Sequence, residues 1–179
     1  MFSGVWRFDQ GLGTVAGHSH MADLIRVAIL WIGSWFLPAE MLRYAFYLLT
    51  LLVGPLGVYA FISHILKKDH RYELYAFIGG LLYLTNVGTV QHFIVPFEMF
   101  AVGYALLPWL FWAGARYIDQ TNKKYFILYT LIAILSAPMA YAATLWYTSF
   151  VGIALFILTY TGKNRIKTGA TLIATLIVT

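Results

Sequence analysis

The sequence lacks cysteine altogether and has few charged residues. Without a thiol it can form no disulfide, no thiolate metal site and no cysteine nucleophile. Only 11% of its 179 residues are charged and 61% are hydrophobic, whereas an average soluble domain is about 25% charged. So few charges could not cover the core of a soluble fold, and a disordered chain would not carry so much apolar surface. The composition, with a mean hydropathy of +0.75, indicates an integral membrane protein.

Acidic residues are scarcer than basic ones: the sequence contains seven Asp and Glu but twelve Lys and Arg. In a membrane protein such a surplus is typical of the cytoplasmic connections between spans, so we expect no nucleic-acid partner. Nine of the basic residues form three clusters: Lys67, Lys68 and Arg71; Arg116, Lys123 and Lys124; Lys163, Arg165 and Lys167. An even number of crossings between successive clusters puts all three on the cytoplasmic face.

Stretches without Asp, Glu, Lys or Arg predict the transmembrane helices. A helix needs about 20 apolar residues to cross about 30 Å of hydrocarbon, and residues 44–66, 74–97 and 99–115 approach or exceed that length. Residues 125–162 would form one helix about 57 Å long. This run therefore has to break, and Pro138 is the expected place because proline removes a backbone donor. We predict an all-α polytopic fold with about five transmembrane spans in the plasma membrane.

The two ends of the chain are expected to differ from these spans. Residues 22–37 are too short and polar-ended for a span, and their tryptophans suit a helix that lies in the membrane interface and ends before Pro38. Residues 168–179 form only about 18 Å of helix, which is too short to cross. The whole chain is expected to be one transmembrane region of a longer protein, with an external loop and the interfacial helix in 1–43 and the spans in 44–179.

Polar residues on the external side are the candidates for chemistry. Asp9 lies in a glycine-rich loop, where a carboxylate can act as a general base or coordinate a divalent cation, or can simply be solvated. His18 and His20 are spaced to share a metal in an extended segment, although no third ligand stands at a diagnostic distance. His92 and Glu98 lie at or just above membrane depth, where polar groups usually face a cavity or a partner.

Three arginines depart from the charge bias of the chain. Arg7, Arg26 and Arg43 are expected on the external side, where the positive-inside rule does not favour them. Because the guanidinium fork matches phosphate oxygens, a phosphate ligand would explain these arginines. Ordinary salt bridges are the alternative, and the acids concerned would be Asp9, Asp23 and Glu40. Motifs of nucleotide-driven pumps and of hydrolases, such as G-x-x-x-x-G-K-[ST] and G-x-S-x-G, are absent from the sequence.

The order of short sequence words over residues 5–120 resembles a known family. A Trp-x-x-Asp-x-Gly-x-Gly loop is followed by Leu-Tyr-Leu-Thr-Asn-Val-Gly-Thr-Val-Gln at 82–91, Pro-Phe-Glu at 96–98 and Leu-Leu-Pro-Trp at 106–109. This pattern resembles the N-terminal membrane region of GT-C-fold glycosyltransferases, particularly the arabinofuranosyltransferase-like bacterial proteins. The resemblance implies transfer of a sugar from a polyprenyl-phosphate donor to an external glycan or lipid acceptor.

The resemblance also implies roles for individual residues. Asp9 matches the acidic residue of the first external loop and would be catalytic, without a required cofactor although a divalent metal could assist it. The residues expected to bind substrate are Arg7, Arg26, Arg43, His92 and Glu98, and the candidate metal ligands are His18 and His20. The sequence departs from the family in having one acid in this loop and no transmembrane helix before it.

Two other classes of protein remain as alternatives. In a transporter, polar residues would line a pathway through a broken helix, and these residues would be Asn86, Gln91, His92 and Glu98. Transport also predicts corresponding polar positions in repeated halves, and the sequence shows no convincing internal repeat. If the chain were a non-catalytic scaffold subunit, its external acids and arginines would not be expected to cluster.

Overall fold

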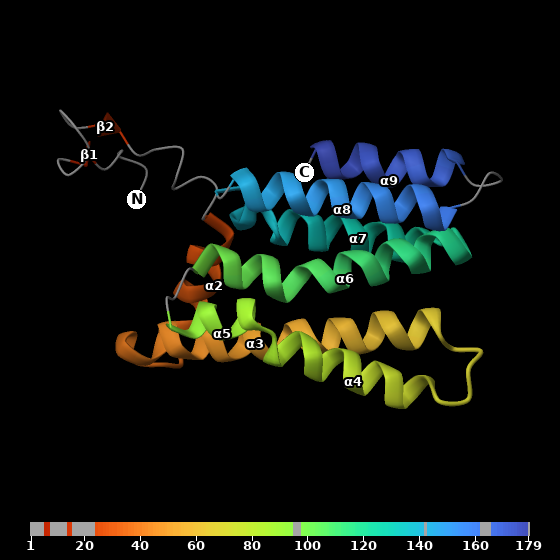
Figure 1. Ribbon diagram of the computed structural model, residues 1–179. Helices are drawn as coiled ribbons and strands as arrows, with labels where there is room; N and C mark the ends of the chain where they lie inside the picture. Colours follow the sequence, from red (N-terminus) through yellow and green to blue (C-terminus); the bar gives the residue numbers. More distant parts are fainter. Residues whose placement is uncertain are drawn as a thin grey trace.

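The computed structural model describes residues 6–7, 14–15, 24–94, 98–141, 143–161 and 166–178, with side chains described within 24–91, 100–140, 144–161 and 166–178. Two short strands, β1 (Trp6–Arg7) and β2 (Thr14–Val15), pair antiparallel. The helices are α2 (Leu24–Gly33), α3 (Ala39–Ile65), α4 (Tyr72–Thr85), α5 (Val87–Ile94), α6 (Glu98–Gln120), α7 (Lys123–Leu135), the 3-10 helix η1 (Ala137–Tyr141), α8 (Ala143–Thr161) and α9 (Ile166–Val178). The predicted all-α class is confirmed, and Figure 1 shows the long helices running side by side.

Two of the described helices are long and apolar enough to cross a membrane, namely Ala39–Ile65 and Thr144–Thr161. Only 22% of the tested window of each is buried, whereas the core helix of a soluble protein would be mostly covered. Helix α3 exposes large leucines along its length, which are Leu48, Leu49, Leu52 and Leu56. Of the roughly five predicted spans, these two meet the length and hydropathy criteria.

Prolines account for some of the places where helices end or begin, but not for all of them. Helix α7 ends at Leu135 and η1 contains Pro138, which confirms the predicted interruption of the 125–162 run. The helix predicted over 22–37 instead ends at Gly33 among the described residues. Pro38 is the N-cap of α3, which therefore begins at Ala39, ahead of the predicted start. Proline suits this place because its missing N–H would have no intrahelical acceptor at a helix start.

The continuous helix predicted over 74–97 is wrong, because the chain breaks at Asn86 between α4 and α5. The Asn86 side chain competes with the helical ladder: its Nδ2 donates to the Tyr83 carbonyl at 2.6 Å and to Thr89 Oγ1 at 2.9 Å. Its Oδ1 accepts from the Thr89 backbone N–H at 3.1 Å. Asparagine commonly ends helices in this way, because its short amide reaches nearby main-chain groups.

Helix α6 is the centre of the described structure, because it packs against α3 on one side and α7, α8 and α9 on the other. The main core lies on the second side and consists of Leu110, Ala113, Ile118, Tyr129, Ile132, Ala133, Ile153, Ile157, Leu172 and Leu176. On the first side, a Cβ on Gly54 of α3 would lie 2.6 Å from the Tyr104 ring, and one on Gly57 would lie 2.8 Å from Trp109. Glycine at these two positions lets large aromatic rings of α6 reach the backbone of α3.

A pair of tyrosines completes the hydrogen bonding of two interrupted helices. Pro108 has no N–H, so the Tyr104 carbonyl four residues earlier lacks its intrahelical donor. The Tyr83 hydroxyl supplies that bond at 2.9 Å. In return the Tyr104 hydroxyl lies 3.4 Å from the carbonyl of Tyr83, in the last turn of α4, and the two rings stack with centroids 4.5 Å apart. Main-chain groups freed inside an apolar bundle are thus satisfied by neighbouring helices.

The two ends of the helix bundle differ in charge. The connections from α3 to α4 and from α6 to α7 lie at one end, together with the end of α8 and the start of α9 (Figure 1). We call this end the lysine end after its described lysines Lys67, Lys68, Lys123, Lys124 and Lys167. The other end, which we call the α2 end, holds α2, α5, η1 and the beginnings of α3 and α6 (Figure 1). The basic clusters predict that the connections at the lysine end lie together.

Labelling of single cysteines tests the membrane orientation. A membrane-impermeant maleimide should reach Lys68→Cys, Asn122→Cys and Asn164→Cys from one common side, since each position lies within one of the three basic clusters. Trp35→Cys, in the exposed connection at the α2 end, should be labelled from the opposite side only. Each label is unique because the sequence contains no cysteine. Labelling of any of the first three from the side of Trp35 contradicts the orientation.

Removal of one hydroxyl tests the tyrosine pair. Tyr83→Phe leaves the Tyr104 carbonyl without a donor and should lower the free energy of unfolding by about 1–3 kcal/mol, the cost of an unsatisfied buried polar group. Tyr75→Phe, an exposed change in the same helix, is the control and should be nearly neutral. Both can be measured by denaturant titration in mild detergent, and equal stabilities of the two variants would contradict the role of Tyr83.

Candidate functional site

An apolar cavity opens near the α2 end between α2, α3, α6 and the segment joining α7 to α8. Its empty space is about 550 Å³ including the open mouth. The lining residues are Ile25, Arg26, Ile29, Phe46, Leu49, Thr50, Val53, Val102, Ala105, Leu106, Leu135 and Pro138. Thr50 adds little polarity, because its hydroxyl donates to the Tyr47 carbonyl at 2.9 Å. The cavity wall therefore suits a hydrocarbon chain.

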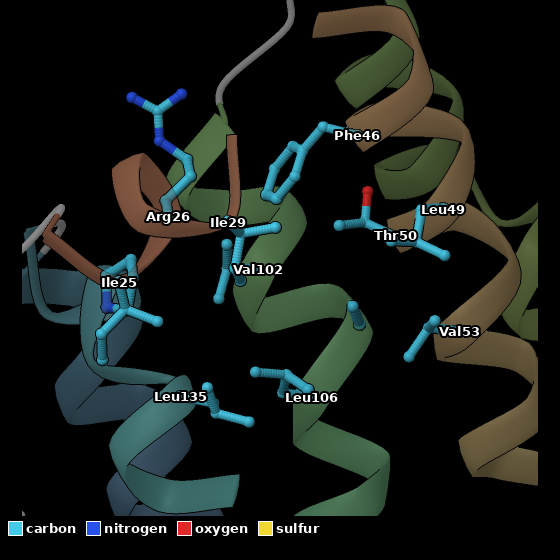
Figure 2. A pocket seen from close by; sticks show the side chains of 12 residues that line it. Ile25, Arg26, Ile29, Phe46, Leu49, Thr50, Val53, Val102, Leu106 and Leu135 are labelled. Carbon is cyan, nitrogen blue, oxygen red and sulfur yellow. The ribbon is translucent and has the colours of Figure 1, made fainter. Parts of the chain in front are cut away.

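Arg26 is the charged residue among those that line this cavity. Figure 2 shows its guanidinium directed away from the apolar side chains, whereas Val53 and Leu106 lie deeper in the hollow. The long aliphatic stem of an arginine can cover apolar surface while its charge stays in a polar region. A ligand with an apolar tail and an anionic head would satisfy both parts of this site.

Arg43 belongs to the same end of the structure. Arg26 from α2 and Arg43 from α3 both lie close enough to the Tyr47 hydroxyl to act on it electrostatically. The Tyr47 hydroxyl oxygen is buried and has no hydrogen-bond partner among the residues that the structure describes. The charges of two guanidiniums thus act on one buried phenol at this end of the bundle, and all three groups can donate to phosphate oxygens.

The structure brings together two of the residues that the sequence predicts for the site, Arg26 and Arg43. The Asp9, His18 and His20 positions lie outside the described residues, and of Arg7 only the backbone, in β1, is described. His92 falls in α5 and Glu98 begins α6, so their backbones lie at the α2 end, but their side chains are not among those described.

Tyr47 is a site residue that sequence reasoning missed. It stands four residues after Arg43, so both side chains share one face of α3. That spacing was a usable signal, whereas the cavity was not foreseeable because its walls come from elements far apart in the chain. Within the described part of the chain, no group of three or more His, Asp or Glu side chains could hold a metal ion.

A second polar cluster, at the lysine end, joins three helices. Asp119 of α6 accepts a hydrogen bond from the Tyr160 hydroxyl at 3.0 Å, and His64 Nε2 lies 2.8 Å from the same carboxylate oxygen. The sequence alone did not single out Asp119. The cluster links α3, α6 and α8, and it lies at the opposite end from the cavity (Figure 1).

Comparison with known proteins adds no relative: no family model matches the chain, and no match was found among curated proteins or solved structures. Function is therefore inferred from the residues and their arrangement.

A pair of amphiphiles tests whether the cavity and Arg26 act together. Dodecyl phosphate should bind at least about tenfold more tightly than dodecanol, because charged hydrogen bonds contribute about 1.5–3 kcal/mol. Arg26→Gln should remove this preference, and Ala105→Trp should weaken binding of both compounds by filling the cavity. Affinities follow from the shift of the thermal unfolding midpoint with ligand concentration in nanodiscs.

Lys67→Gln removes one positive charge at the lysine end and serves as the control for Arg26→Gln. It should keep the preference for dodecyl phosphate, since Lys67 lies in the connection from α3 to α4, which does not line the cavity. An unchanged preference in Arg26→Gln, or an equal loss in Lys67→Gln, would show that the phosphate does not bind beside the cavity.

Proposed function

We propose that the chain is the membrane region of a glycosyltransferase in the plasma membrane. The enzyme takes a sugar from a polyprenyl-phosphate donor and transfers it to a glycan or lipid acceptor on the external face. This proposal extends the resemblance to the GT-C-fold family. The observation that carries it is the apolar cavity with Arg26 at its edge and Arg43 near by.

The site suits a lipid-linked donor in two respects. The isoprenoid chain is apolar and branched, and it would fill the hollow between α2, α3 and α6. The phosphate would meet Arg26, Arg43 and the unpaired hydroxyl of Tyr47. The cavity is lined by residues of α2 and of the neighbouring parts of α3 and α6, at the end opposite the described lysines, and the positive-inside rule makes this end external.

The reaction needs a base for the acceptor hydroxyl, and we assign this role to Asp9. The hydroxyl oxygen bonds to the anomeric carbon of the sugar while the bond from that carbon to the phosphate oxygen breaks. The hydroxyl proton passes to the Asp9 carboxylate, and the electron pair of the broken bond stays on the polyprenyl phosphate. The arginines stabilise the negative charge that develops on this leaving group. No metal is needed for these steps.

A transporter is the competing function, and the break at Asn86 is the observation that favours it. Broken helices in transporters present unpaired main-chain groups to an ion or substrate. Here the Asn86 amide, the Thr89 hydroxyl and the Tyr83 carbonyl bond to one another. The polar groups at this break are engaged within the protein, so we prefer the enzyme.

Substitution of the base tests the proposed chemistry. Asp9→Asn should lower sugar transfer by about 10²–10⁴-fold, the usual contribution of general-base catalysis. Expression and membrane insertion should be unaffected, because the substitution leaves the apolar spans unchanged. Transfer is measured with the purified protein in proteoliposomes, using a polyprenyl-phosphate sugar and a glycan acceptor.

Two further variants separate catalysis from donor binding. Arg43→Ala should raise the KM for the donor and lower kcat far less than Asp9→Asn does, because Arg43 binds the phosphate in the donor complex as well as in the transition state. Glu40→Gln, an exposed change in the first turn of α3, is the control and should have little effect. Normal transfer by Asp9→Asn would remove Asp9 from the mechanism. Solute movement across the liposomes without any sugar transfer would favour the transporter.

A further inference from the structure

Arg116, near the lysine end of α6, is a basic residue whose role the proposed function does not explain. Its guanidinium carbon lies 5.6 Å from the ring centroid of Trp112 and 5.5 Å from that of Tyr125 in α7. The two rings are themselves edge to face, with centroids 6.2 Å apart. Arg116 is therefore held in one place by an aromatic corner that two helices form.

The hydrogen-bonding capacity of Arg116 is not used by the described part of the chain. Its Nε atom is buried there without a hydrogen-bond partner, and no carboxylate of the described side chains forms a salt bridge with it. Asp119, the nearest acid along α6, is engaged with His64 and Tyr160. The aromatic rings stabilise the positive charge but accept none of the five N–H donors of a guanidinium.

The surroundings of Arg116 add positive charge. Helix α7 begins with Lys123 and Lys124, both exposed, and its first turn presents main-chain N–H groups. Trp112 and Tyr125 are of the residue types that lie at headgroup depth in a membrane. The site therefore has positive charge and hydrogen-bond donors, but the described residues supply no anionic oxygen that accepts from the guanidinium.

We propose that Arg116 binds the phosphate of an anionic phospholipid headgroup between α6 and α7. The guanidinium donates to the phosphate oxygens, while Trp112 and Tyr125 keep its plane in position. Lys123 and Lys124 favour a headgroup with net negative charge over a zwitterionic one. This site lies at the opposite end from the cavity and does not depend on the glycosyltransferase proposal (Figure 1).

Lipid titration followed by native mass spectrometry tests this proposal. The protein in detergent is titrated with phosphatidylglycerol, with phosphatidylcholine and with inorganic phosphate. The wild type should bind phosphatidylglycerol more tightly than phosphatidylcholine, and inorganic phosphate should neither bind measurably nor displace the lipid. Arg116→Gln should weaken binding of phosphatidylglycerol at least about tenfold, because it removes charged hydrogen bonds to the phosphate.

Arg71→Gln is the matched control, because it removes an exposed arginine from the same end of the bundle. Its affinity for phosphatidylglycerol should equal that of the wild type. Arg116→Lys keeps the charge but loses the planar fork, so its affinity should be intermediate; this variant gives the answer if Arg116→Gln does not fold.

Three results would overturn the proposal. Arg116→Gln, or Arg116→Lys in its place, could bind phosphatidylglycerol as tightly as the wild type, which would remove Arg116 from the site. An equal loss in Arg71→Gln would indicate a general charge effect. Binding of inorganic phosphate as tight as that of the lipid would indicate a soluble anion as the ligand.

Discussion

The structure depends on the satisfaction of main-chain hydrogen bonds where its helices are interrupted. Pro108 deprives the Tyr104 carbonyl of a donor, and the break at Asn86 leaves the Tyr83 carbonyl at a helix end. In an apolar environment each such group costs several kcal/mol unless it finds a partner. The Tyr83 hydroxyl bonds to the Tyr104 carbonyl across the gap between α4 and α6, and the side chains of Asn86 and Thr89 donate to the Tyr83 carbonyl. The interruptions therefore bind neighbouring helices together.

The indole N–H of Trp109 also needs a partner in the bundle, and this need explains how closely α3 approaches α6. Trp109 donates its indole N–H to the Val53 carbonyl at 3.0 Å, next to the proline of α3. This bond requires the ring to lie against the α3 backbone, and Gly57 provides the room. Nearer the α2 end, the two helices separate, and the cavity lies between Phe46 of α3 and Val102 of α6 (Figure 2). Helices α3 and α6 are therefore in close contact near Gly57 and separate at the α2 end, where the cavity lies.

Charge is distributed so that each end of the bundle has a different role in our proposals. At the α2 end, Arg26 and Arg43 lie near a buried hydroxyl and an apolar hollow, which together suit a lipid phosphate. At the lysine end, Arg116 is held by aromatic rings and lacks an acceptor among the described residues. Both sites place the guanidinium plane, which prefers phosphate oxygens, near the end of an apolar bundle.

Residue patterns alone were enough to predict the all-helical class, the presence of helices apolar enough to cross a membrane and the break near Pro138, because hydropathy and proline act locally along the chain. The charge bias also singled out Arg26 and Arg43 as candidates, and their role in a site stays a prediction. The break at Asn86 was not foreseen, because an uncharged run of that length permits a continuous helix and only the bonds to Thr89, Tyr83 and Tyr104 make the interruption stable. The cavity, the convergence on Tyr47 and the aromatic corner at Arg116 were decided by tertiary structure alone. Each of these features is formed by residues from different helices. The spacing of residues within one helix does not show which other helices will pack against it.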